Sequence, residues 1–374
     1  MPSWLKEGRG SLCGANVSLL LREMGITKPL LVAGERTKNV FFARTGMRLP
    51  VFDAFHPNPD LQDCVAGAAL YQEKGCDGLI SVGGGSAMDT AKGIKALLMT
   101  DIAHVRANQL PSEGNVPHLA IPGTAGTGAE TTAVAVLYEN GQKLSVDHPA
   151  LLPDGVLLDG SLLDTLPEYH RKSCAMDALA QGIESWWAKK ATPGSRIHAE
   201  RAIRGVLDNL TAYLQGDRKA QDEMLHAAYE SGVAILTTRT TAAHAMSYQI
   251  TKKLGAAHGH ACMLTLPHLW AHLAAQAEYQ PMLTELSRLL GGEKPMNGAI
   301  LLKGLLAVLE LDKIPMPDDA TLDMLAASVN PERLGNHPEE LTTAQLRAIY
   351  VQAFTPMTDT ERAEAIAAWE QYGK

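Results

Sequence analysis

The sequence predicts an α/β protein in which a nucleotide-binding domain with a mostly parallel sheet is followed by an all-helical domain. Continuous apolar runs, each typical of a buried strand, occur at 29–33, 78–82 and 118–122. Segment 61–74 between the first two has helical periodicity, and strands that alternate with helices indicate a parallel sheet covered on both faces. Beyond residue 159 helical patterns dominate. We therefore place the domains at 1–160 and 161–374.

The composition indicates a globular protein and argues against several kinds of partner. The chain has 374 residues, of which 46% are hydrophobic and 20% charged, enough for two domains with separate cores. Its net charge of −8 argues against binding to nucleic acid or to a membrane surface. Its apolar runs are all shorter than the roughly 20 residues of a membrane-spanning helix.

The cysteines and the N-terminal segment predict a cytoplasmic location. The cysteines are scattered, odd in number and without C-x-x-C spacing, as expected of reduced thiols. They are Cys13, Cys64, Cys76, Cys174 and Cys262. The N-terminal residues lack the apolar core of a signal peptide.

Two glycine-rich turns are candidates for cofactor binding. The strand at 78–82 leads into three glycines at 83–85 and then into a helix, with Ser86 as candidate N-cap and Asp89 three residues later. Glycine backbone can approach an anion closely, and the N–H groups of a helix N-terminus attract a pyrophosphate. A second turn, 122–132, is rich in Gly and Thr, which suit ribose and phosphate contacts. The alternatives are a tight turn that binds nothing and a flexible loop.

Four polar residues of the second domain could form a metal site. Asp177 and Gln181 are spaced i, i+4 on a predicted helix and therefore share a face. With His244 and His258 they offer a carboxylate, an amide oxygen and two imidazoles, which could bind a divalent ion and leave a position open for substrate. The alternative is that both histidines are hydrogen-bonded core residues.

Together these segments resemble the iron-containing (group III) alcohol dehydrogenases over nearly the whole chain. The matching motifs are PNP at 57–59, GGGSxxDxAK at 83–92, TAGTGxExT at 124–132, a DAL helix at 177–179 and a late histidine-rich stretch. The resemblance implies a Rossmann-like domain, a helical domain of the dehydroquinate synthase-like architecture, and an active site in the cleft between them. It also implies hydride transfer between NAD(P)(H) and an aldehyde or alcohol, with a divalent metal that polarises the substrate oxygen.

The resemblance implies roles for individual residues. The implied metal ligands are Asp177, Gln181, His244 and His258, and the implied cofactor contacts are Gly83, Gly84, Gly85, Ser86, Asp89, Thr124, Thr127 and Lys143. Iron(II) is the expected metal, with zinc, manganese or magnesium as alternatives. Gln181 stands where most members have a histidine, and its harder oxygen favours iron, manganese or magnesium over zinc. Loss of the metal is the alternative.

The cofactor preference is predicted from the segment after the first long strand. Members that prefer NAD have an acidic residue there, where this chain has Gly34. The missing carboxylate leaves room for a 2′-phosphate, which Arg36, Thr37 or Lys38 could hold. We therefore expect NADP(H), and Glu35 would favour NAD(H) if it turned inward.

The substrate is predicted from residues around His244. Arg239 precedes it by five residues and Lys252 lies in the same region, and the TTAAHAxSY wording is similar to the branch that reduces phosphonoacetaldehyde to 2-hydroxyethylphosphonate. A guanidinium suits a phosphonate, or the sulfonate of sulfoacetaldehyde. The alternatives are an Arg239 paired with a helix carboxylate and a general short-chain alcohol dehydrogenase.

Tyr248 and His260 are the predicted proton relay. Tyr248 stands where many members of the resembled family have a further histidine. Two other classes remain as alternatives: a lyase related to dehydroquinate synthase, and a non-catalytic nucleotide-binding scaffold with a degraded metal site. The resemblance also implies a homodimer or a larger homo-oligomer.

Overall fold

The computed structural model describes residues 6–112 and 116–372 and forms two compact units, the first ending at Leu166 and the second beginning at Pro167. Residues 1–5, part of the segment from which we predict the absence of a signal peptide, lie outside the described residues. No helix in the described ranges combines the length and the apolar character needed to cross a membrane.

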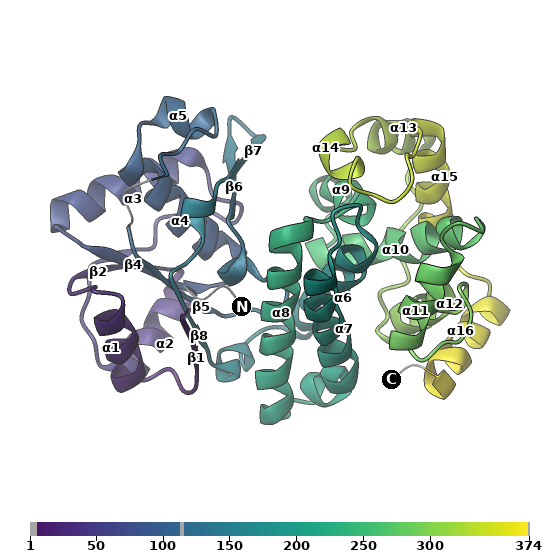
Figure 1. Cartoon of the computed structure of the whole chain (residues 1–374), viewed down its shortest axis with the longest axis horizontal. Coiled ribbons are helices and arrows are strands. Elements are labelled where there is room, and N and C mark those ends of the chain that lie inside the picture. Colours follow the sequence, from purple (N-terminus) through teal and green to yellow (C-terminus); the bar gives the residue numbers. More distant parts are fainter. Residues whose placement is uncertain (1–5, 113–115, 373–374) are drawn as a thin grey trace. The chain divides into compact units, whose positions relative to one another are not determined.

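The first unit is built on a six-stranded sheet in the order β1-β8-β5-β4-β2-β3 (Figure 1). Its strands are β1 (Lys6–Arg9), β2 (Pro29–Ala33), β3 (Val51–Phe52), β4 (Gly78–Gly83), β5 (His118–Pro122) and β8 (Gly155–Leu158). All neighbouring strands in it are paired in parallel. The three apolar runs predicted as strands are β2, β4 and β5, so the prediction of a parallel sheet is confirmed.

Helices cover both faces of this sheet. They are α1 (Gly14–Glu23), α2 (Glu35–Thr45), α3 (Leu61–Lys74), α4 (Gly85–Met99) and α5 (Ile102–Arg106). Leu31 and Ile80 belong to the core cluster that contains residues of α1 and α2, whereas Leu30 and Leu79 belong to the cluster that contains residues of α3 and α4. Because adjacent strand residues enter opposite cores, the strands are apolar along their whole length.

A small antiparallel hairpin, which the sequence analysis does not predict, completes the first unit. β6 (Val134–Glu139) pairs with β7 (Gln142–Asp147) through the turn Asn140-Gly141, where φ is 52° and 73°. Two positive φ values are the signature of a type I′ turn, for which Asn-Gly is the preferred sequence. The single-turn helices η1 (Ala129–Thr131), η2 (Pro149–Leu151) and η3 (Gly160–Leu163) lie in the connections.

The described part of the second unit is all-helical, as predicted. Its helices are α6 (Glu168–Trp187), α7 (Pro193–Leu214), α8 (Arg218–Thr238), α9 (Ala242–Gln249), η4 (Ile250–Leu254), α10 (His258–Ala274), α11 (Gln280–Leu289), α12 (Asn297–Val308), α13 (Asp319–Ala327), α14 (Pro331–Leu334), α15 (Thr343–Phe354) and α16 (Asp359–Tyr372). Helix α6 packs against α7, α8 and α10, and α10 packs against α9. These contacts bring together the residues of the candidate metal site.

The start of α4 corrects one prediction. The N-cap residue is Gly84, in extended conformation, so Ser86 lies inside the first turn and is not the N-cap. The hydroxyl of Ser86 instead accepts a hydrogen bond from the backbone N–H of Asn58 at 3.3 Å. Among the described residues no side chain caps α4, which leaves its first N–H groups available to an anion.

Candidate functional site

In the first unit, the loops after β2 and β4 line one cavity of about 320 Å³. These strands are neighbours in the parallel sheet, so their carboxyl ends meet at the same edge, where α/β folds bind ligands. The lining includes Gly34, Arg36 and Thr37 at the start of α2 and residues 83–86 at the start of α4. The structure therefore brings together the residues predicted to hold the adenosine ribose and the pyrophosphate.

The glycines at 83–85 allow an unusual backbone conformation and close packing of the two glycine-rich turns. Gly83 has φ of 147°, a region that L-residues rarely adopt. A Cβ at Gly84 would lie 3.2 Å from Cγ2 of Thr124, and one at Gly85 would lie 3.6 Å from Cγ2 of Thr127. The second glycine-rich turn thus packs directly on the first, which places both predicted threonines beside the phosphate loop.

Hydrogen bonds hold two of the predicted cofactor residues, Arg36 and Thr37, in place. Arg36 Nη1 donates to the backbone oxygen and the hydroxyl of Thr165, at 2.8 and 2.7 Å. Thr37 donates from Oγ1 to the carbonyl oxygen of Val82 at 2.9 Å. Asp89 lies in α4, and Lys143 lies on β7.

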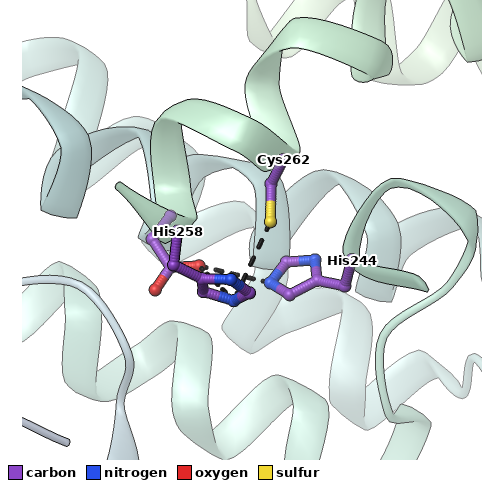
Figure 2. A group of neighbouring side chains, drawn as sticks. His244, His258 and Cys262 are labelled. Atoms are coloured by element: carbon purple, nitrogen blue, oxygen red, sulfur yellow. Dashed lines mark hydrogen bonds and ion pairs between the residues drawn. The ribbon is translucent and has the colours of Figure 1, made fainter. Parts of the chain in front are cut away.

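In the second unit, four side chains from three helices meet in one cluster. Asp177 comes from α6, His244 from α9, and His258 and Cys262 from α10; each offers one ligand atom, and these atoms all lie within 4.8 Å of one another. The distance from Asp177 Oδ1 is 3.2 Å to His244 Nε2 and 3.9 Å to His258 Nε2. Figure 2 shows both rings and the thiol of Cys262 pointing toward one another. We call these four residues the metal cluster.

Both histidines are oriented by hydrogen bonds at their other ring nitrogen. His244 Nδ1 contacts a carboxylate oxygen of Glu184 in a short hydrogen bond. The hydroxyl of Ser247 donates to the carbonyl oxygen of His244, so it can accept from Nδ1 of His258, which is 3.3 Å away. With Nδ1 occupied in each ring, Nε2 is the nitrogen available to a metal, an arrangement typical of metal-binding histidines.

Glu184 also fixes the start of α9. Its Oε1 accepts from the backbone N–H of Thr241 at 3.2 Å and of Ala243 at 2.8 Å, and from the Thr241 hydroxyl at 2.6 Å. One fully buried carboxylate of α6 therefore satisfies the first N–H groups of α9 and holds the ring of His244. Sequence reasoning did not single out Glu184, although it lies one helical turn after Gln181.

The charges of the metal cluster stabilise one another. Burial would raise the pKa of Asp177, but His258 and His244 outweigh burial and hold it below its ordinary value. Burial would likewise raise the pKa of the Cys262 thiol, but the same two rings lower it to about 7. The pKa of His244 is raised well above its ordinary value: burial lowers it, and Cys262 and Glu184 more than compensate. The cluster thus favours a positive charge at its centre.

The donor set fits a divalent metal ion. One carboxylate, two imidazole nitrogens and one thiol sulfur converge at distances that a single ion could bridge after small shifts. Asp177, His244 and Cys262 are buried, and the side chain of His258 is 38% exposed. The residues present therefore agree with the metal that the sequence predicts, with Cys262 as a donor that the sequence analysis missed.

The fourth sequence-predicted ligand, Gln181, is placed differently. Its Oε1 accepts a hydrogen bond from the hydroxyl of Ser231 at 2.8 Å, and its Nε2 donates to Asp177 Oδ1 at 3.4 Å. In this orientation the amide supports the carboxylate of Asp177 and directs its oxygen to Ser231. A metal-binding role of Gln181 stays a prediction.

The two predicted proton donors occupy different surroundings. The ring of Tyr248 stacks on His258, with centroids 6.0 Å apart and an interplanar angle of 15°. The ring nitrogens of His260 contact Tyr169 Oη at 3.1 Å and the carbonyl oxygen of Leu311 at 2.8 Å. Tyr248 therefore lies beside the metal cluster, whereas both nitrogens of His260 already have partners.

Arg333, which the sequence analysis missed, also approaches this region. Its guanidinium carbon lies 5.4 Å from the centroid of the Tyr248 ring, and its Nη1 donates to Thr240 Oγ1 at 3.0 Å. The predicted anion ligand Arg239 instead donates from Nη1 to the carbonyl oxygen of Leu236, and Lys252 lies in η4. Arg333 was not predicted as a site residue because it lies far from His258 in the sequence, with several helices between them.

Two family models match the chain. One, described as iron-containing alcohol dehydrogenase, matches residues 3–160, and the other, the C-terminal region of the Fe-containing alcohol dehydrogenase family, matches residues 172–354. The chain belongs to the iron-containing alcohol dehydrogenase family.

Individual relatives agree with this assignment. The probable alcohol dehydrogenase EutG of Escherichia coli is 34% identical over 65% of this chain and 60% of its own length. The phosphonoacetaldehyde reductase of Streptomyces viridochromogenes is 35% identical over 57% of this chain and 58% of its own length. The matches therefore span less than two thirds of these two curated relatives.

A solved structure is similar over almost the whole chain. The sulfoacetaldehyde reductase of Bifidobacterium kashiwanohense, in complex with NAD+, superposes with a TM-score of 0.86 at 26% identity. The match covers 95% of this chain and 97% of that chain.

Proposed function

We propose that the protein is a metal-dependent aldehyde reductase that uses NADPH or NADH and acts on a small anionic aldehyde. Phosphonoacetaldehyde, with 2-hydroxyethylphosphonate as product, is the substrate we favour, and sulfoacetaldehyde is the alternative. Membership in the family supports the reaction class. Two similar proteins are named as reductases of aldehydes of this kind.

The position of Arg333 carries the choice of an anionic substrate. Its guanidinium stacks on Tyr248, whose ring stacks on His258 of the metal cluster. Among the described residues no carboxylate lies within ion-pair distance of Arg333. A half-buried guanidinium without a carboxylate partner favours an anionic ligand, and its planar donors match phosphonate or sulfonate oxygens.

The chain's own residues account for binding and protonation. The metal cluster would hold a divalent ion, which would polarise the aldehyde oxygen as a Lewis acid, and a bound nicotinamide would supply the hydride. Burial raises the pKa of Tyr248, so the phenol stays protonated at neutral pH and can donate a proton from Oη to the developing alcohol oxygen. Arg333 orients the anionic end, and the loop at 83–86 binds the cofactor phosphates.

The experiment compares phosphonoacetaldehyde with propanal, a neutral aldehyde of similar size, in the wild type and in Arg333→Gln. We expect the wild type to prefer phosphonoacetaldehyde by about tenfold or more in kcat/KM, equivalent to about 1.4 kcal/mol of transition-state stabilisation. Because glutamine keeps a donor but loses the charge, Arg333→Gln should lose most of this preference.

Arg196→Gln is the matched control, because Arg196 also stacks on an aromatic ring, that of Trp186, with 5.5 Å to the centroid. The control should keep the wild-type preference for the anionic aldehyde. Equal turnover of both aldehydes by the wild type would sink the anionic substrate and leave a general short-chain alcohol dehydrogenase. Cofactor binding without turnover of any aldehyde would instead favour the non-catalytic scaffold.

A second experiment tests the preference for NADP(H) at Gly34. This residue is the N-cap of α2 with φ of −66°, and among the described residues no heavy atom other than those of its two chain neighbours lies within 4 Å of its Cβ position. Aspartate is a favoured N-cap residue, so Gly34→Asp should fold normally. Its carboxylate would repel a 2′-phosphate and accept from ribose hydroxyls.

We expect Gly34→Asp to lower kcat/KM for NADPH relative to NADH by about tenfold or more, or about 1.4 kcal/mol. Gly34→Asn, of equal size and without charge, separates electrostatic repulsion from steric effects. An unchanged cofactor ratio in Gly34→Asp would show that the 2′-position of the ribose lies elsewhere.

Several predictions from the sequence remain proposals. We also propose that Arg239 and Lys252 bind the anionic end of the substrate and that His260 relays a proton. The variants described above do not test these three roles. The same holds for the cytoplasmic location and for a homodimeric or larger assembly.

A further inference from the structure

The metal cluster contains a sulfur donor, Cys262, that is not among the metal ligands implied by the family resemblance. Cys262 follows His258 by one turn of α10, so both side chains lie on the same face of that helix. Its Sγ lies 3.9 Å from His258 Nε2, and within 4.8 Å of the ligand atoms of Asp177 and His244. The Cys262 side chain is fully buried.

We propose that Cys262 is the fourth protein ligand of the metal, in addition to Asp177, His244 and His258. The inference rests on the metal dependence of the proposed function. On binding, the sulfur–metal bond forms and the thiol proton passes to solvent, as is usual for cysteine ligands. The resulting thiolate and the Asp177 carboxylate together balance the two positive charges of a divalent ion.

The surroundings of Gln181 are consistent with this ligand set. Its amide group donates to Asp177 Oδ1, which orients the carboxylate, and its oxygen accepts from Ser231. Gln181 is thereby a positioning residue for Asp177. The Cys262 thiol contacts His258 within the cluster, as the dashed line in Figure 2 shows.

A sulfur ligand changes which metal the site prefers. Thiolates are soft donors that favour zinc and other late transition metals over magnesium and manganese, whereas an amide oxygen favours the harder ions. A Cys262 ligand therefore predicts the reverse of the metal order expected from Gln181 as ligand. Iron(II) and cobalt(II) also accept such a mixed set.

The test uses the full-length protein loaded with cobalt(II) or zinc(II) as probes. In the cobalt protein we expect a near-ultraviolet charge-transfer band from thiolate to metal. In the zinc protein we expect X-ray absorption to show one sulfur scatterer at about 2.3 Å, beside nitrogen and oxygen at about 2.0–2.2 Å. Neither readout depends on catalytic turnover.

Three variants assign the signal. Cys262→Ser should abolish the charge-transfer band, whereas Cys174→Ser should keep it, because Cys174 is a thiol of α6 outside the metal cluster. Gln181→Ala should also keep the sulfur signal. The wild-type X-ray absorption spectrum decides the question even if Cys262→Ser does not fold.

The outcomes separate this inference from the proposed function. A wild-type protein that binds one metal without a sulfur scatterer overturns the Cys262 ligand and leaves the metal-dependent reductase standing. A charge-transfer band that survives Cys262→Ser overturns it as well. A wild-type protein that binds neither metal contradicts both proposals.

Discussion

Gly259→Ala is expected to destabilise the helical unit and to separate the metal ligands. A Cβ at Gly259 would lie 2.0 Å from the carbonyl oxygen of Ser173 and 2.6 Å from the backbone nitrogen of Asp177. Both atoms belong to the backbone of α6 and cannot move aside independently. Because Gly259 directly follows His258, α10 must shift away from α6 and carry that ligand away from Asp177.

Helix propensity and packing predict opposite signs for this substitution. Alanine is favoured over glycine by up to about 1 kcal/mol inside a helix. Overpacking costs about 1–3 kcal/mol or more, and backbone contacts this short belong at the upper end. We therefore expect a net loss of about 2 kcal/mol or more, or roughly 4–8 °C in the midpoint of thermal unfolding for a unit of this size. We also expect weaker cobalt(II) binding.

Gly194→Ala provides the matched control. Gly194 is the second residue of α7, as Gly259 is of α10, but its nearest contact to a built Cβ is Thr192 Oγ1 at 3.8 Å. The control should be neutral or slightly stabilising. Both variants are compared with the wild type in two quantities, the midpoint of thermal unfolding and the affinity for cobalt(II). If Gly259→Ala matches the wild type in both, as Gly194→Ala should, the close packing of α6 and α10 does not set the spacing of the ligands.

The sequence predicts the three adjacent strands β5, β4 and β2 of the first unit's sheet because both faces of these strands are buried, whereas β1, β3 and β8 were not predicted. Apolar runs such as 29–33 and 78–82 need no tertiary information to be recognised, and they coincide with β2 and the first five residues of β4. The hairpin β6–β7 was not predicted from the sequence, because its strands are only partly buried and their hydrophobic pattern is therefore weaker. The Asn140-Gly141 pair was the available signal.

The candidate site could be predicted only in part, because its members come from distant segments. Asp177, His244 and His258 were found through family motifs, and the structure brings them together. Cys262 follows His258 at helical spacing, but in the sequence alone nothing distinguishes it from the other scattered cysteines. Arg333 belongs to a short helix far along the chain, and only tertiary packing places it on Tyr248.

Glu184→Ala is expected to lower both the stability of the helical unit and its metal affinity. The Glu184 carboxylate is fully buried and accepts hydrogen bonds from the backbone at the start of α9 and from the His244 ring. Its loss leaves these donors without an acceptor, and breaking a buried charged pair costs about 3–5 kcal/mol. Because His244 Nδ1 also loses its partner, the ring is free to turn, and metal affinity should fall by about 10–100-fold.

Two further variants separate the structural effect from the effect on the metal. Glu230→Ala removes another buried glutamate that pairs with a histidine, His198, outside the metal cluster. It should destabilise the unit while the dissociation constant for zinc(II), measured by chelator competition, stays unchanged. In Glu184→Gln one carboxylate oxygen becomes an amide N–H group, which cannot accept a hydrogen bond from the backbone N–H groups of α9 or from the His244 ring. Zinc affinity should therefore fall even where the variant folds. Wild-type zinc affinity in a folded Glu184→Gln would mean that the charge of Glu184 does not hold His244 in its metal-binding orientation.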